Sequence, residues 1–184
     1  MSKLFVDEIV HQSSQGSGTI TLGASGETVA LASGASQTMA VNTPAFSAYL
    51  STSQSFSVNT DTKVNMTSEN YDTNSAYDAA NSKFTIPSGE GGKYRFLFSA
   101  RTGNIHTTRF LGMIWKNGSA VTTAENRIAI GSGTTFISVN FSIDINCVAG
   151  DYFEPYVYMT DSAGLSGSST NQITVWSASK LIGA

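Results

Sequence analysis

An all-β fold, a β-sandwich or jelly roll, is the fold class that the sequence predicts. Charged residues make up only 12% of the chain, and its polarity comes mainly from Ser, Thr, Asn and Gly, which suit strands and turns. Several runs alternate apolar and polar side chains with the period of two that is typical of a half-buried strand. No long amphipathic helical pattern is present. Many short strands joined by Gly-rich turns favour two packed sheets.

Two long runs in the second half of the chain alternate most clearly. The first covers residues 94–99, with Tyr94, Phe96 and Phe98 at every second position. The second alternates apolar residues with Ser, Asn and Asp, and its apolar members are Ile137, Val139, Phe141, Ile143 and Ile145. Each run predicts a strand with one face buried and the other in solvent. A shorter run, residues 173–176, alternates in the same way.

Two short signals predict tight turns between these strands. Asn117-Gly118 lies between two β-rich runs and predicts a hairpin, because both residue types tolerate the positive φ of a type I′ turn. Gly150-Asp151 precedes the aromatic run "YFEPYVYM". Pro155 interrupts that run, and because proline cannot donate to a ladder, it predicts an edge strand or a bulge.

Residues 1–42 differ in character from the rest of the chain. Here "TITLGASGE" is followed by the similar "TVALASGAS", and Pro44 marks the entrance to the globular part. Strands of this kind expose unpaired backbone edges, which favour addition to another chain's sheet. We therefore predict an extended, β-rich attachment and oligomerisation segment at 1–42 and a head domain at 43–184. The apolar residues expected to mediate attachment are Leu4, Val6, Ile9, Ile20, Leu22, Val29 and Leu31.

A series of short motifs in the head resembles the globular head of complement component one-q, in the tumour necrosis factor-like jelly-roll superfamily. In chain order the motifs are "PAFSA", "YDAANSKFTIP", "GKYRFLFSA", "WKNG" and "VAGDYF". The residues that match the family pattern are Phe46, Tyr77, Asp78, Phe84, Pro87, Gly92, Tyr94, Phe96, Lys116, Asn117, Gly118, Gly150 and Asp151. The resemblance implies a jelly roll of about ten strands that assembles as a homotrimer. The collagen-like stalk of that family is missing, and "TVWSASKLIGA" matches its last strand only loosely.

The N-terminal segment resembles a different group of proteins. "KLFVDEIVHQ", followed by strands rich in Gly, Ser and Thr, is similar to the opening segments of tail-fibre and other virion structural proteins of marine tailed bacteriophages, cyanophages especially. This resemblance implies a structural virion protein, made in the host cytoplasm: a homotrimeric fibre, appendage or capsid-decoration component. The segment would bind other virion structural proteins, and the head would contact the host surface.

The alternative is a glycan- or receptor-binding module of the tumour necrosis factor-like superfamily without a scaffold role in a virion. Loops on a rigid sandwich often carry recognition, and the donors of Arg and Asn suit hydroxyl and carboxylate groups. The candidate receptor-binding loop contains Arg101, Asn104, His106 and Arg109. A second candidate loop covers residues 160–171. A signalling ligand is disfavoured, because "MSKLFVDEIVHQSS" has no apolar signal segment.

Six aromatic residues exceed what a sheet facing solvent needs: Tyr94, Phe96, Phe98, Tyr152, Tyr156 and Tyr158. Some are expected in the core of the monomer and others in a trimer interface, where aromatic burial is favourable. Sequence alone does not divide them.

Catalysis is not predicted. The chain has two histidines and none of the common hydrolase or redox motifs. Four carboxylates lie close in sequence, Asp144, Asp151, Glu154 and Asp161. A glycosidase uses two such groups, but without a motif we interpret them as strand and turn residues. Asp161 alone is a poor basis for a calcium site. We therefore predict no catalytic residue, cofactor or metal.

Charge and hydropathy exclude two further classes of partner. The net charge is −3 and no basic block occurs, which argues against nucleic-acid binding. No apolar run approaches the ~20 residues of a membrane-spanning helix. The single cysteine, Cys147, excludes an intrachain disulfide framework and is expected to behave as a small hydrophobic residue.

Overall fold

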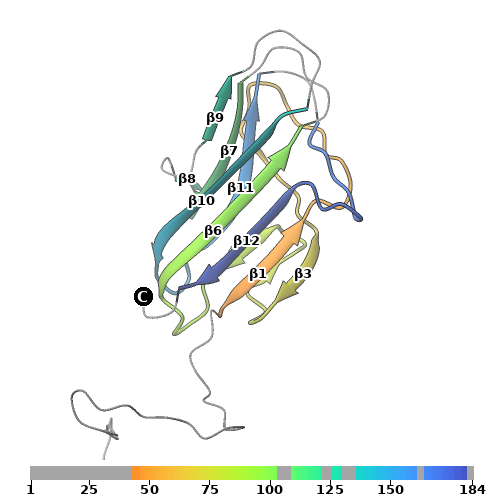
Figure 1. The fold of residues 1–184 in the computed structure, drawn as a ribbon. Helices are drawn as coiled ribbons and strands as arrows, with labels where there is room; N and C mark the ends of the chain where they lie inside the picture. Colours follow the sequence, from red (N-terminus) through yellow and green to blue (C-terminus); the bar gives the residue numbers. More distant parts are fainter. Residues whose placement is uncertain (1–42, 103–108, 122–125, 130–135, 161–163, 182–184) are drawn as a thin grey trace, which may run out of the picture. The chain divides into compact units, whose positions relative to one another are not determined.

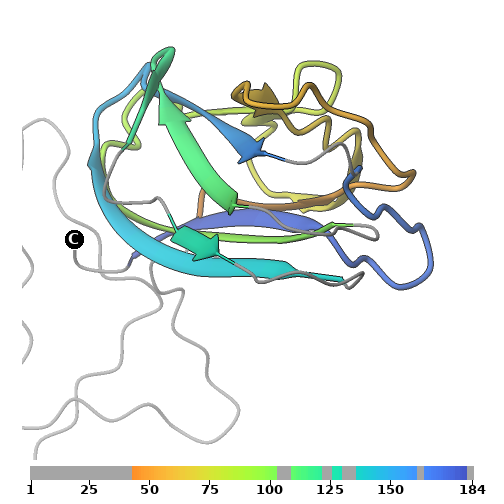
Figure 2. The same cartoon turned by 90° about the horizontal axis from the view of Figure 1, so that it is seen from above.

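Two antiparallel β-sheets form two layers in the computed structural model of this chain (Figures 1 and 2). The structure describes residues 43–102, 109–121, 126–129, 136–160 and 164–181. Residues 1–42 lie outside this set, so the predicted domain boundary and the seven attachment residues stay predictions. In the described part, no helix is long and apolar enough to cross a membrane.

The first sheet has five strands and carries the longest alternating runs. Its order is β10 (Ser138–Cys147), β6 (Gly92–Arg101), β12 (Val175–Lys180), β1 (Ala45–Tyr49) and β3 (Ser68–Asp72). All four pairings are antiparallel. β10 and β3 are therefore the edge strands of this layer.

The second sheet has seven strands. Its main order is β4 (Tyr77–Asp78), β5 (Lys83–Thr85), β11 (Tyr152–Met159), β7 (Arg109–Lys116) and β8 (Ser119–Ala120). Two more strands join it: β2 (Thr62–Lys63) pairs with β11, and β9 (Asn126–Ala129) pairs with β7. From β5 to β12 the chain crosses repeatedly from one layer to the other, the pattern of a jelly roll. Short two-residue strands bring the described number to twelve.

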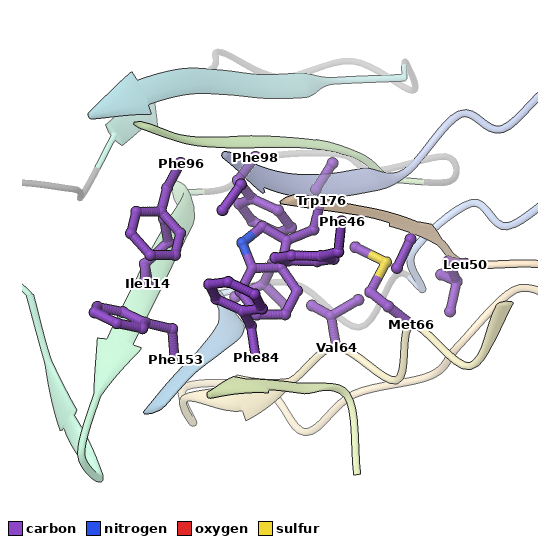
Figure 3. Close-up of a cluster of buried hydrophobic side chains, with 14 of the residues drawn as sticks. Phe46, Leu50, Val64, Met66, Phe84, Phe96, Phe98, Ile114, Phe153 and Trp176 are labelled. Atoms are coloured by element: carbon purple, nitrogen blue, oxygen red, sulfur yellow. The ribbon is translucent and has the colours of Figure 1, made fainter. Parts of the chain in front are cut away.

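An aromatic core fills the space between the layers (Figure 3). Phe46 of β1 lies near its centre, with ring centroids 4.6 Å from both Tyr77 and Phe84 and 4.7 Å from Trp176. Phe46 and Trp176 are 0% exposed. Offset and edge-to-face contacts of this kind stabilise a core beyond the burial of area alone.

β6 and β12, which pair with each other near the middle of the first sheet, differ in how well their alternation predicts the buried face. Tyr94, Phe96 and Phe98 of β6 are all 0% exposed, as the alternation predicts. The alternation over residues 173–176 indicates an apolar face of Ile173 and Val175, and this face is wrong: Thr174 and Trp176 point inward, whereas Ile173 and Val175 are only half-buried. The indole has more apolar surface to bury than valine, which explains this choice of face.

The alternating strand β10 is less buried than its pattern predicts. Its apolar residues face the core beside Phe98, Phe96 and Tyr94 of β6. Val139 is fully buried, but Phe141, Ile143 and Ile145 are only half-buried. The alternation therefore predicts correctly which face of β10 points to the core. It does not predict how deeply those side chains are buried, because β10 is the outermost strand of its sheet.

Pro155 does not mark an edge strand. β11 pairs with β7 on one side and with β5 and β2 on the other, so the edge-strand alternative of that prediction is wrong. In an antiparallel strand the N–H and C=O of one residue point to the same neighbour. The Pro155 carbonyl accepts a hydrogen bond from the Val64 N–H at 2.9 Å, where the partner changes from β5 to β2. The missing donor of proline interrupts no regular ladder there.

The predicted hairpin at Asn117-Gly118 is confirmed. These residues join β7 to β8, with Lys116 paired to Ser119. Their φ angles are 53° and 80°, the positive values that a type I′ turn requires.

Candidate functional site

The predicted receptor-binding loop is described only at its two ends. Arg101 ends β6 in the first sheet, and Arg109 begins β7 in the second. The Arg101 guanidinium lies 5.1 Å from the ring centroid of Phe136, and that of Arg109 lies 5.8 Å from the ring of Tyr158. Asn104 and His106 lie outside the described residues, as do residues 161–163 of the second candidate loop. Both loop assignments therefore stay predictions.

The six candidate aromatics divide by strand. The three from β6 belong to the core of the monomer. Tyr152, Tyr156 and Tyr158 of β11 are half-buried and lie on the opposite face of their strand from the buried Phe153 and Val157. The outer face of the second sheet therefore carries a row of tyrosines that the core does not use.

Strand β7 adds a tryptophan to this outer face. Trp115 stacks on Tyr156, with centroids 4.1 Å apart and an angle of 16° between the rings. Lys63 forms a 2.6 Å ion pair with Glu154 on the same face. Burial, and then the charge of Glu154, raises the pKa of Tyr156. Sequence reasoning missed Trp115, although its position two residues after Met113 on a strand was a usable signal.

The three described carboxylates of the sequence cluster lie apart, each beside a basic side chain. Asp144 accepts two hydrogen bonds of 2.8 Å from Arg95 on the outer face of the first sheet. Glu154 pairs with Lys63 on the second sheet, and Asp151 lies in a turn, 2.7 Å from the Lys116 ammonium. Asp161 lies outside the described residues. Three of the four carboxylates thus each have their own basic partner, as structural residues do.

The thiol of the only cysteine has low reactivity. Cys147 is 2% exposed, and burial raises the pKa of its thiol to about 12, so the reactive thiolate is scarce near neutral pH. Within the described ranges, no three His, Cys, Asp or Glu side chains gather in a way that suits a metal ion.

Comparison with known proteins identifies the fold. No family model and no curated protein sequence matches the chain, but solved structures do. The crystal structure of murine APRIL at pH 5.0 is 13% identical over 74% of this chain and 98% of the chain in that structure, with a TM-score of 0.55. The pH 8.0 form of murine APRIL is 14% identical with the same coverage and a TM-score of 0.50.

The fold is a jelly roll. The globular domain of zebrafish complement 1qA also matches, at 15% identity over 75% of this chain and 96% of that domain, with a TM-score of 0.48. At such low identity the two APRIL structures show a common fold and nothing finer. They confirm the jelly-roll fold that the head motifs predicted, and no comparison bears on the predicted resemblance of residues 1–42 to phage proteins.

Two of the sequence motifs meet in one turn of the jelly-roll head. Asp151 is 6% exposed and accepts hydrogen bonds from the Asn117 amide at 2.8 Å and the Val148 N–H at 2.9 Å. The Asn117 side-chain oxygen accepts the Tyr152 N–H at 2.9 Å. The "KNG" and "GD" motifs therefore hold the β7–β8 hairpin against the start of β11. Their role is structural.

Substitution of Asp151 by Asn should lower the free energy of unfolding by about 1–3 kcal/mol at neutral pH, because Lys116 loses its carboxylate partner. Burial raises the pKa of Asp151. The contacts with Lys116, Val148 and Asn117 lower that pKa by more than burial raises it, so the net shift is downward. The carboxylate therefore stabilises the native state above its unfolded pKa of about 4. This contribution is lost as the pH falls through the lowered native pKa.

Urea unfolding at pH 7 and at lower pH values measures both effects. The Asn variant should lose less stability than the wild type as the pH falls below about 4. Glu69→Gln, at an exposed position of β3, is the control and should change stability by less than about 0.5 kcal/mol. Equal acid sensitivity of wild type and Asp151→Asn would show that this ion pair does not stabilise the turn.

Proposed function

We propose that this chain is a structural component of a tailed-phage virion, in which a homotrimeric jelly-roll head is joined to the particle by residues 1–42. The observation that carries the trimer is the half-buried apolar row of β10: Phe141, Ile143 and Ile145. The phage context is supported by the resemblance of "KLFVDEIVHQ" to virion proteins. The chain would serve in a fibre, an appendage or a capsid decoration.

The edge of the first sheet has the character of a subunit interface. Along β10 the apolar row lies at an edge that has no described partner strand beyond it. On the outward face of neighbouring β6, Leu97 is 43% exposed. Leu97 lies on the opposite face of the sheet from the apolar row, and a hollow of about 310 Å³ at this edge is lined by Leu97, Phe98, Ser99, Asn140, Phe141 and Ser142. Burial of this apolar surface against a second copy removes it from water, which is favourable.

Polar groups around this surface favour a defined geometry of assembly. The Arg95–Asp144 pair and the 2.5 Å hydrogen bond from Ser99 to Asn140 link β6 to β10 beside Leu97. An apolar centre with a polar rim is typical of specific interfaces. The family resemblance of the head implies three copies around one axis, and closed symmetry buries the same surface in every copy.

Multi-angle light scattering on the purified full chain tests the assembly. We expect a molar mass of three times 19.4 kDa. A monomer at micromolar concentration would overturn the proposed trimer, whatever the role of the N-terminus.

Removal of residues 1–42 tests the attachment role. The head that remains, residues 43–184, should keep the oligomeric state of the full chain in light scattering, because the proposed interface lies within the head. It should fail to join particles, since the edge strands proposed to add to a neighbouring sheet are gone. Copy number on purified particles, measured by quantitative mass spectrometry, gives the result. Equal incorporation of the head and the full chain would contradict the attachment role.

The second candidate is a glycan- or receptor-binding module, and the aromatic outer face of β7 and β11 favours it. The two roles are compatible in one molecule. Particle incorporation without any glycan signal supports the scaffold role alone. Glycan binding without incorporation supports the binding module.

A further inference from the structure

A hollow of about 240 Å³ opens on the outer face of the second sheet, on the side away from the aromatic core. Asp61, Arg109, Leu111, Met113, Ala120 and Tyr158 line it. β7 and β11 lie side by side here, with Leu111 paired to Tyr158 and Met113 to Tyr156. The hollow is therefore built mainly on two adjacent, hydrogen-bonded strands, which hold its side chains in a fixed arrangement.

The floor of the hollow is apolar and its rim is polar. Leu111 and Met113 are 4% and 5% exposed, yet they do not belong to the core cluster. The Tyr158 ring forms a wall. Its hydroxyl is within 3.2 Å of the Asn59 side-chain oxygen, to which it donates, and this contact fixes the ring orientation. Arg109 lies 5.8 Å from the ring centroid, and Asp61 supplies an exposed carboxylate at the rim.

We propose that this hollow binds a neutral hexose unit of an oligosaccharide. A sugar ring presents an apolar C–H face, which packs on an aromatic ring such as Tyr158, and hydroxyl groups at its edge, which both donate and accept. The Asp61 carboxylate accepts from hydroxyls, and the Arg109 guanidinium donates to them. The volume lies below the ~300–1,000 Å³ of pockets for drug-sized ligands, so one ring is the expected occupant.

The neighbouring aromatic pair extends the site along β11. Tyr156 lies two residues from Tyr158 on the same strand face, which places their Cα atoms about 7 Å apart. Tyr156 stacks on Trp115, and the Lys63–Glu154 ion pair lies beside it. A second sugar ring linked to the first has an aromatic surface and polar partners there. Binding of an oligosaccharide should therefore be tighter than binding of the free hexose.

Charge favours a neutral sugar over an anionic ligand. Among the described lining residues, one carboxylate and one guanidinium offset each other, and the carboxylate repels phosphate and uronic acids. The site does not depend on the virion role or on the trimer, because its lining comes from one chain and lies on the other sheet from the proposed interface.

Isothermal titration of the full chain with lactose, maltotriose, mannotriose and chitotriose tests the site. We expect at least one of these probes to bind. Tyr158→Leu removes the aromatic face but keeps an apolar side chain, and Asp61→Ala removes the acceptor at an exposed position. Each substitution should raise the Kd for that probe about tenfold or more. The matched control is Tyr71→Leu, which changes a tyrosine that is 52% exposed on the first sheet and should leave affinity unchanged.

Failure of all four probes to bind overturns the proposal, as does a bound probe whose affinity both Tyr158→Leu and Asp61→Ala leave unchanged. Thermal unfolding checks that each variant is folded. If Tyr158→Leu does not fold, Asp61→Ala alone decides. Asp61→Ala should also join particles as well as the wild type, so loss of sugar binding and loss of the structural role are separate outcomes.

Discussion

Replacement of Phe46 by alanine is expected to lower the free energy of unfolding by about 3–5 kcal/mol, among the largest effects of any single change in the head. Phe46 is 0% exposed and contacts Tyr77 and Phe84 from the second sheet and Trp176 from its own. The truncation removes the ring that joins the two layers and leaves a cavity that packed neighbours fill only in part.

Urea unfolding at one fixed protein concentration measures this effect, because the midpoint of an oligomer depends on concentration. Tyr71→Ala is the control, since its ring is 52% exposed, and it should shift the free energy by less than about 0.5 kcal/mol. Similar losses for the two variants would mean that the core is not centred on Phe46.

Replacement of Leu97 by glutamate is expected to convert the proposed trimer to a monomer. Leu97 is 43% exposed on the outward face of β6, so a charge there leaves the fold of the single chain intact. In the assembled interface the same charge must lose its water without a partner, which costs several kcal/mol at each copy. Because three copies carry the change, the penalty is repeated in every contact of the ring.

Light scattering gives the mass of this variant directly, and circular dichroism shows whether its strands are retained. The matched control is Val58→Glu, which places the same charge at another apolar residue, 39% exposed, outside the strands of the first sheet. That variant should remain trimeric. A trimeric Leu97→Glu protein would place the interface on another surface of the head.

Local signals predicted several strands and one turn of the head. The alternation of Tyr94, Phe96 and Phe98 predicted both the strand and its buried face, because the side-chain period of a strand is fixed by covalent geometry. Asn117-Gly118 predicted its turn because few residue pairs tolerate positive φ at both positions. The order of the motifs predicted the jelly roll.

Neighbouring strands decided what local signals could not. A central strand and an edge strand can have the same alternation that β10 has. Only the tertiary structure shows that β10 is an edge strand and that Phe141 is therefore half-buried. Pro155 by itself predicts an edge strand, yet it lies in an interior strand, β11, at the point where the neighbouring strand changes from β5 to β2. In both cases depth depends on which strands lie beside the residue, and those partners are distant in sequence.

The sequence by itself determined the fold class, the buried faces of β6 and β10, the Asn117-Gly118 turn and the absence of common catalytic motifs, since each depends on residues within a few positions of one another. Only the tertiary structure decided which aromatics fill the core and which line the outer face of β7 and β11. Only it placed Asp61 beside Arg109 and Tyr158, and paired Lys116 with Asp151. Strand pairing brings these groups together across long separations, and one-dimensional periodicity carries no information about which strands pair.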